Sequence, residues 1–233
     1  MAVFVVAHGA WRAGWAWRKV RPLIRAAGHE IFTPTHSGQG EREHLSRPEV
    51  NLDTHIQDVA NVLLCEDLRD VVLIGHSYGG MVITGVAERV ADRLSQLVYL
   101  DAFVPDDGQS LADLMPDGGQ GFRKDAQSTG DGWRVSPNPI PPDTSPEDQA
   151  FMRARRLPQS IRTFEQPVHL TNPAAAKLRR TYIYCTRNDS GVFTQFATRF
   201  SDDPAWRYRE IAASHNPYIT VPEQTSELLL SLL

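Results

Sequence analysis

The chain has 233 residues, 41% of them hydrophobic and 22% charged, and its formal net charge at pH 7 is −4. This composition is ordinary for a globular enzyme, and charges of both signs alternate along the chain, so we expect no nucleic-acid partner. The N-terminal apolar run MAVFVVA is short and has no basic region before it, so we expect no signal peptide and no membrane partner.

Two cysteines, Cys65 and Cys185, lie far apart in the chain. A secreted disulfide framework would use more of them, so we predict that both are reduced and buried. The expected compartment is therefore the cytoplasm. The sequence leaves the oligomeric state open, and a homodimer is one of the options.

Short β-branched runs alternate with helical patterns in the N-terminal part of the chain. The runs lack the period-2 alternation of a half-exposed strand, which is typical of parallel strands buried on both faces. Between them, apolar residues recur at helical spacing, as over 53–68, where Asp53 is the expected N-cap. Strands are expected at 2–7, 30–34, 70–75 and 97–103.

The middle of the chain differs in composition. Residues 105–173 hold 10 of the 16 prolines and show no strong strand pattern, although Ser145-Pro146 is typical of a helix start. We predict that this segment is an inserted, mainly helical cap on a core formed by residues 1–104 and 174–233.

The α/β pattern resumes after the insertion, with strands expected at 180–185 and 206–212 and a helix at 191–200 between them. Thr220 and Glu223 have the spacing of a capping box before the last helix. The predicted fold class is α/β: a doubly wound, mostly parallel sheet of about six strands with a helical cap.

The segment Gly75-His76-Ser77-Tyr78-Gly79 has the pattern G-x-S-x-G between an expected strand and an expected helix. In such a nucleophile elbow the serine lies on a tight turn with its hydroxyl exposed, and the glycines avoid collisions between strand and helix. Ser77 is the predicted nucleophile. No dinucleotide fingerprint, P-loop or zinc motif occurs in the sequence, so we expect no cofactor and no metal.

A serine nucleophile needs a base, and His215 is the best placed of the eight histidines. It follows the last expected strand, at the edge of the sheet that Ser77 occupies. His76 should pack beneath the elbow, and His8 ends the first strand. Surface positions are expected for His36, His44, His55 and His169.

The base needs a carboxylate that orients it, and two candidates follow expected strands. Asp189 lies in the turn CTRNDSGVF, whereas Asp101 ends the strand at 97–103 and could instead anchor the junction with the cap. Chain order fits both, and the Ser190-Gly191 turn favours Asp189. The two oxyanion donors are expected to be the N–H groups of Ala10 and Tyr78.

The pocket should be apolar. We expect it to be lined by Trp11, next to the oxyanion loop, and by Phe103 and Trp133. The expected substrate is therefore small and apolar.

The chain resembles the α/β-hydrolase superfamily, and within it the small-cap branch of EstC-like esterases, plant methyl-ester esterases and hydroxynitrile lyases. The resemblance rests on HGAWRAGWAWRKVRPLIRAAGHE, GHSYGGM, VYLDAFVPDDGQS, TRNDSG and SHNPYITVPEQ. It implies Ser77 as nucleophile, His215 as base and Asp189 as acid, with the N–H groups of Ala10 and Tyr78 at the oxyanion.

This resemblance predicts a serine hydrolase that cleaves a small carboxylic ester through an acyl-enzyme. A lactonase or thioesterase with the same triad is an alternative, as is a non-catalytic receptor for a small ligand. A hydroxynitrile-lyase-like enzyme is disfavoured, because the lyases of the branch carry a lysine after the catalytic histidine and this chain has Asn216.

Overall fold

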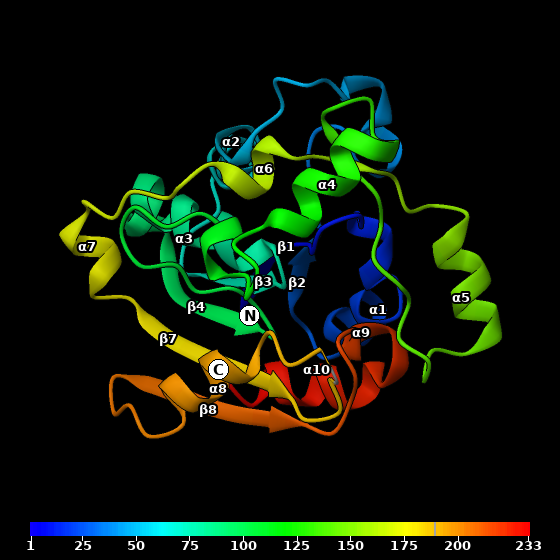
Figure 1. The fold of residues 1–233 in the computed structure, drawn as a ribbon. Coiled ribbons are helices and arrows are strands. Elements are labelled where there is room, and N and C mark those ends of the chain that lie inside the picture. The colour runs from blue at the N-terminus through cyan, green and yellow to red at the C-terminus, as the bar shows by residue number, and fades with distance from the viewer. Residues whose placement is uncertain (189) are drawn as a thin grey trace.

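Six parallel strands form the central sheet of the protein (Figure 1). The computed structural model describes residues 1–188 and 190–233. The strand order is β2-β1-β3-β4-β7-β8, and every neighbouring pair is parallel, which confirms the predicted fold class. The strands are β1 (Val3–Ala7), β2 (Glu30–Phe32), β3 (Val71–His76), β4 (Leu94–Leu100), β7 (Arg179–Cys185) and β8 (Trp206–Ile211).

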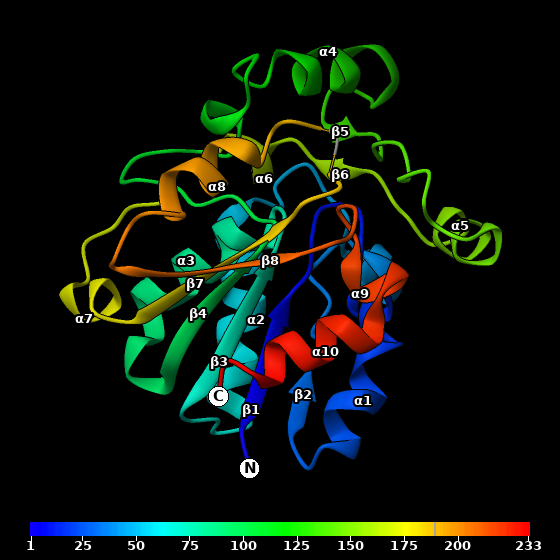
Figure 2. The ribbon, with the colours of Figure 1, turned by 90° about the horizontal axis from the view of Figure 1, so that it is seen from below.

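Helices cover both faces of this sheet (Figure 2). Successive side chains of a strand point to opposite faces, so neighbouring residues such as Phe4 and Val5 belong to two separate buried clusters. The cluster of Val5 includes side chains from α2 (Leu52–Cys65), α3 (Gly79–Val90) and α8 (Thr194–Phe200). The cluster of Phe4 includes side chains from α1 (Val20–Ala26), α9 (Pro217–Thr220) and α10 (Pro222–Leu230).

Two predicted helix caps are wrong. Helix α2 is capped by Asn51, which has extended backbone angles and accepts a hydrogen bond from the backbone N–H of Thr54 at 3.0 Å. Asp53 lies in the first turn instead and pairs with Arg89. The capping box at Thr220 does not form, because Thr220 ends α9.

The chain between β4 and β7 lies mostly beyond the carboxyl ends of the strands (Figure 2). Ser145 caps α5 as predicted, accepting from the N–H of Asp148. A two-stranded antiparallel ladder was not expected, because strands of two residues carry no periodic signal. The segment contains α4 (Gln120–Thr129), β5 (Arg134–Val135), α5 (Pro146–Arg153), β6 (Gln159–Ser160), α6 (Arg162–Glu165) and α7 (Pro173–Ala176).

Short 3-10 helices occupy Gly14–Trp17, Gly40–Leu45, Ala91–Arg93 and Ala112–Leu114. Both cysteines are free thiols; Cys185 is buried as predicted, but Cys65 is exposed at the end of α2. Within the described part of the chain, every helix is too short or too polar to cross a membrane.

Candidate active site

Ser77 lies on the turn between β3 and α3. Its φ of 55° is in the left-handed region, where a residue with a side chain is strained. The turn is possible because two flanking positions lack side chains: a Cβ at Gly75 would lie 2.5 Å from the carbonyl oxygen of Gly79, and one at Gly79 would collide with the carbonyl oxygen of Ala7. The sequence therefore builds the predicted elbow, with Ser77 lining a cavity.

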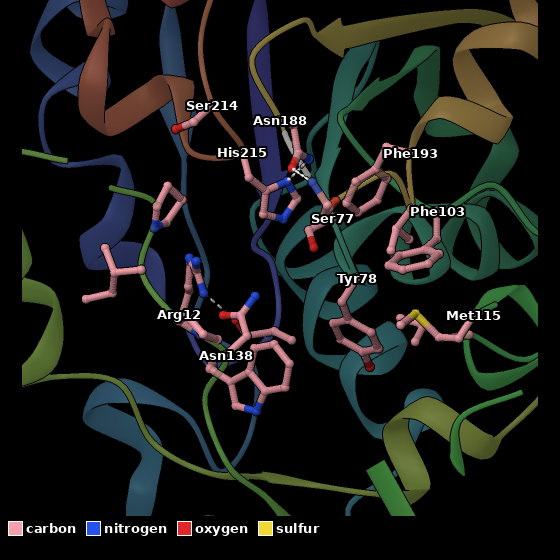
Figure 3. Close-up of a pocket in the computed structure, with 18 of the residues that line it drawn as sticks. Arg12, Ser77, Tyr78, Phe103, Met115, Asn138, Asn188, Phe193, Ser214 and His215 are labelled. Carbon is pink, nitrogen blue, oxygen red and sulfur yellow. Dashed lines mark hydrogen bonds between the residues drawn. The ribbon is translucent and has the colours of Figure 1, made fainter. Parts of the chain in front are cut away.

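His215 lies on the loop after β8, and its Nδ1 atom is 2.7 Å from Oδ2 of Asp101. Because a carboxylate only accepts, this distance means that Nδ1–H donates to Asp101 and that Nε2 is left free to act as a base. His215 and Ser77 line the same cavity, and Figure 3 shows the imidazole ring and the serine hydroxyl next to each other. The structure thus brings the predicted nucleophile and base together.

Asp101 follows β4 and is fully buried. Its backbone also has a positive φ, 43°, in the left-handed region. The carboxylate accepts hydrogen bonds from Nδ2 of Asn188 at 2.6 Å and from the N–H of Cys185 at 3.3 Å. Both bonds hold the carboxylate in position beside His215.

Asn188 was considered in the sequence only as the neighbour of Asp189, and its role here was missed. Its Nδ2 is 3.4 Å from Nδ1 of His215, longer than the 2.7 Å between that nitrogen and Asp101, so the amide serves the carboxylate first. Asp189, the residue predicted to be the acid, lies outside the described residues. Its role stays a prediction.

The two residues expected to supply the oxyanion N–H groups, Ala10 and Tyr78, both line the cavity. Ala10 lies on the loop after β1, and Tyr78 directly follows Ser77. In residues 1–188 and 190–233, no hydrogen bond uses either backbone N–H. The next residue, Trp11, is fixed by the segment between β4 and β7: its backbone N–H donates to Oε1 of Gln159 at 3.1 Å, and its indole N–H donates to the carbonyl of Val135 at 2.8 Å.

The cavity has a volume of about 780 Å³ and two chemically different ends. Figure 3 shows Phe103, Phe193 and Met115 on one side of Ser77, and Arg12 and Asn138 on the other. A substrate with an apolar part and a polar part fits this division.

Of the three expected pocket residues, Trp11 and Phe103 line the cavity. Trp133 is not among the lining residues, which corrects its expected placement. Its ring instead lies against the guanidinium of Arg134, 4.5 Å from the ring centroid. Trp133 directly precedes β5, a strand of two residues that could not be predicted from the sequence.

Three buried histidines stack beside the elbow, which corrects the expected surface positions of two of them. The ring centroids of His8 and His36 are 3.8 Å apart, and those of His36 and His55 are 4.7 Å apart. Nδ1 of His55 is 2.9 Å from the hydroxyl of Tyr78. Burial lowers the pKa of His8 to about 3 and that of His55 to about 4, so both are neutral at pH 7.

His76 lies beneath the elbow as predicted and is fully buried. Its Nε2–H donates to the backbone carbonyl of His215 at 2.7 Å, which fixes the loop that carries the base. Burial, and then the positive charge that His215 can carry, hold the pKa of His76 well below its usual value. His76 therefore supports His215 as a neutral donor. Among the described residues, no group of three His, Cys, Asp or Glu side chains is arranged to hold a metal ion.

A model of the alpha/beta hydrolase family matches residues 3–228, so the chain belongs to this family. It is 39% identical to the carbendazim hydrolyzing esterase of Nocardioides sp. (strain SG-4G), over the full length of both chains. It is 30% identical to methylesterase 1 of Arabidopsis thaliana, in an alignment that covers 53% of this chain and 48% of the relative.

Among solved structures, an extracellular alpha/beta-hydrolase from a Paenibacillus species superposes with a TM-score of 0.83. The two proteins are 27% identical, and the superposition covers 99% of this chain and 98% of the other. Family, relatives and fold agree with the elbow at Ser77. The protein is a carboxylic-ester hydrolase of the serine type.

Proposed function

We propose that Ser77, His215 and Asp101 form the catalytic triad of this ester hydrolase. The observation that carries the proposal is the 2.7 Å contact between Oδ2 of Asp101 and Nδ1 of His215, at the cavity that Ser77 lines. This contact leaves Nε2 of His215 free to take the proton of Ser77 Oγ as that oxygen attacks the ester carbonyl. Asp101 then stabilises the imidazolium that forms.

The rest of the cycle follows from the same groups. The imidazolium of His215 gives its proton to the leaving alcohol, and the acyl group stays on Ser77. His215 next removes a proton from water, which attacks the acyl-enzyme and releases the acid. The N–H groups of Ala10 and Tyr78 bind the negative oxygen of both tetrahedral intermediates, and one such donor is worth about 2.7–4 kcal/mol in a comparable site.

The substrate that we propose is a small ester with an apolar group on one side of the carbonyl. The size of the cavity, about 780 Å³, and the rings of Phe103 and Phe193 support this assignment. So do the relatives, which include an esterase named for carbendazim and a plant methylesterase. In this proposal residues 105–173 act as the cap that closes the cavity over the bound ester.

The compartment that we propose is the cytoplasm. The free thiols of Cys65 and Cys185 support it, because disulfides persist mainly in oxidising compartments. Cell fractionation of the native host, with an antibody against the protein, tests the assignment; recovery from the culture medium would refute it.

Turnover of p-nitrophenyl butyrate tests the proposed chemistry. The wild-type protein should complete many cycles per molecule, and Ser77→Ala should reduce kcat by about 10³-fold or more. Ser128→Ala, a change on exposed α4, is the matched control and should keep the wild-type rate. Equal, slow hydrolysis by wild type and Ser77→Ala would refute the triad and favour a small-ligand receptor.

A further inference from the structure

Arg12, two residues after the proposed oxyanion donor Ala10, has a buried guanidinium. Only 3% of its surface is exposed. Its hydrogen bonds go to uncharged acceptors: Nε and Nη2 donate to Oδ1 of Asn216 at 3.3 and 3.1 Å, and Nη1 donates to the carbonyl of Ala10 at 2.9 Å. Because arginine stays protonated and a buried charge is costly without an opposite one, this arrangement is unusual for a purely structural residue.

A second guanidinium, that of Arg156, lies near Arg12. Its Nη2 donates to Oδ1 of Asn138, and its Nε is buried without a partner among the described residues. Burial, and then the positive charge of Arg12, lower the pKa of Arg156 to about 9. Two positive charges, one buried and one half-buried, therefore lie close enough to repel each other, and an anion beside them would reduce that repulsion.

The protein itself supplies no such anion in the part of the chain that the structure describes. The ion pairs in residues 1–188 and 190–233 include neither Arg12 nor Arg156. Asp143 lines the same cavity, but it is exposed to solvent and lies more than 4.0 Å from both guanidinium groups. The positive charge is thus available to a ligand in the cavity.

The position of this charge relates it to the reaction. Arg12 and Asn138 line the cavity that holds Ser77 and His215, and Figure 3 shows them across from Phe103 and Phe193. Arg156 is not among the lining residues, but its Nη2 donates to Asn138, which is. A group bound at Arg12 would therefore belong to the same molecule as the ester carbonyl at Ser77, on the side opposite the aromatic rings.

We propose that Arg12, reinforced by the charge of Arg156 behind Asn138, binds a carboxylate of the substrate, so that the enzyme prefers esters that are themselves anions, such as half-esters of dicarboxylic acids. The inference rests on the proposed function, because it assigns the substrate class of the same site. Guanidinium groups bind carboxylates through paired, charge-assisted hydrogen bonds, and the guanidinium of Arg12 lines the cavity. The carboxylate also reduces the repulsion between the two arginines.

Three matched ester series test the preference. Monomethyl esters of the linear dicarboxylic acids from succinate to suberate are compared with methyl alkanoates in which a methyl group replaces the carboxylate. The neutral dimethyl esters form the third series and separate charge from polarity. The best half-ester should exceed both neutral partners in kcat/KM by about tenfold or more. A preference for the alkanoate at every length would overturn the proposal while leaving the esterase intact.

Substitution of Arg156 locates the preference. The quantity compared is kcat/KM for the half-ester divided by kcat/KM for the alkanoate. Arg156→Gln should reduce this ratio by about tenfold. Arg156→Lys should retain part of the preference for the half-ester, because the charge remains. Arg155→Gln is the matched control, since Arg155 is exposed and lies over the ring of Phe151; its ratio should stay at the wild-type value. If folded Arg156→Gln keeps the wild-type ratio, the proposal is overturned. If Arg156→Gln does not fold, the ratio measured for Arg156→Lys decides in its place.

Binding to Ser77→Ala separates this inference from the proposed reaction. Calorimetry should show that monomethyl adipate binds about tenfold more tightly than methyl hexanoate, and that adding Arg156→Gln removes the difference. If wild type cleaves no ester but this binding difference is found, the proposed function fails and the anion site stands. Equal binding of the two ligands overturns the anion site, whatever the ester assays give.

Discussion

The carboxylate of Asp101 and the imidazole of His215 lie 2.7 Å apart, although 114 positions separate them in the chain. This contact makes Asp101 the proposed orienting acid and gives the first prediction. Asp101→Asn should lower kcat on p-nitrophenyl butyrate by about 10⁴-fold, because an amide that donates to Nδ1 holds the imidazole in the wrong tautomer. KM should change little, since Asp101 is buried behind His215 and does not line the cavity.

Asp189→Asn is the matched comparison, because the same carboxylate-to-amide change is made between two residues that line the cavity, Asn188 and Ser190. With Asp101 as the acid, Asp189→Asn should retain most of the wild-type kcat. A severe loss in Asp189→Asn with an active Asp101→Asn would make Asp189 the acid.

Asn188 donates a hydrogen bond to the carboxylate of Asp101, and its replacement should alter the pH dependence of activity. Asn188→Asp places a second carboxylate beside Asp101, 3.4 Å from Nδ1 of His215 at the amide's present position. Extra negative charge beside the ring stabilises the imidazolium, so the acid limb of the activity profile should move to higher pH.

The measurement is the profile of kcat/KM against pH for wild type and Asn188→Asp, with Asn188→Ala as the control that removes the amide without adding charge. An acid limb that stays in place in Asn188→Asp would show that the new carboxylate does not act on His215.

The strands and the elbow could be predicted because their signals are local. The runs that became β1 and β3 are continuous and apolar, and the glycines around Ser77 are required by contacts within a few residues. The acid could not be chosen in this way. Asp101 follows β4 and Asn188 follows β7, and these strands are neighbours in the sheet, so position in the chain alone does not favour one carboxylate over the other. The positive φ of Asp101 has no sequence signal.

The wrong predictions share a different cause. His36 and His55 were expected in solvent because their sequence neighbours are polar, yet they are buried by stacking on each other and on His8. Arg12 was not considered for the site at all, since a single arginine in the sequence is normally a surface residue. Contacts between residues far apart in the chain decide whether such side chains are buried, and the local sequence pattern does not reveal these contacts.

Gln159 connects the segment between β4 and β7 to the oxyanion loop, and we expect it to act as a positioning residue. Gln159→Met keeps the side-chain volume but removes two hydrogen bonds, the one accepted from the backbone N–H of Trp11 and the one donated to Oγ1 of Thr163. The loop that carries the N–H of Ala10 then loses a hydrogen bond that positions it, so kcat should fall by about tenfold while KM changes little.

Gln39→Met is the matched control for Gln159→Met. It removes a hydrogen bond from Nε2 of Gln39 to the carbonyl of Pro158, the residue next to Gln159, without touching the oxyanion loop. Gln159→Met removes one hydrogen bond more than Gln39→Met and should lose more in melting temperature, but only Gln159→Met should lose kcat. A parallel loss of kcat in both variants would assign the effect to general loosening of this segment.

The buried histidines should make folding sensitive to mild acid. Burial holds the pKa of His8, His36, His55 and His76 below the ordinary value of 6.5 in the folded state. Below pH 6.5 the unfolded chain takes up protons that the folded chain excludes, so the free energy of unfolding falls with pH by about 1.4 kcal/mol per pH unit for each histidine. The loss continues until the pH reaches the folded-state values, near 3 for His8 and 4 for His55.

His36→Phe tests this linkage at one ring. Both ring nitrogens of His36 are buried without partners among the described residues, so an aromatic ring without nitrogen should preserve stability at pH 7.5. Between pH 6 and 5, urea unfolding should show a slope about 1.4 kcal/mol per pH unit shallower than in wild type. His169→Phe, at an exposed position, should leave the slope unchanged. Identical slopes in wild type and His36→Phe would mean that His36 takes up its proton in the folded protein, and that the stack tolerates a charge.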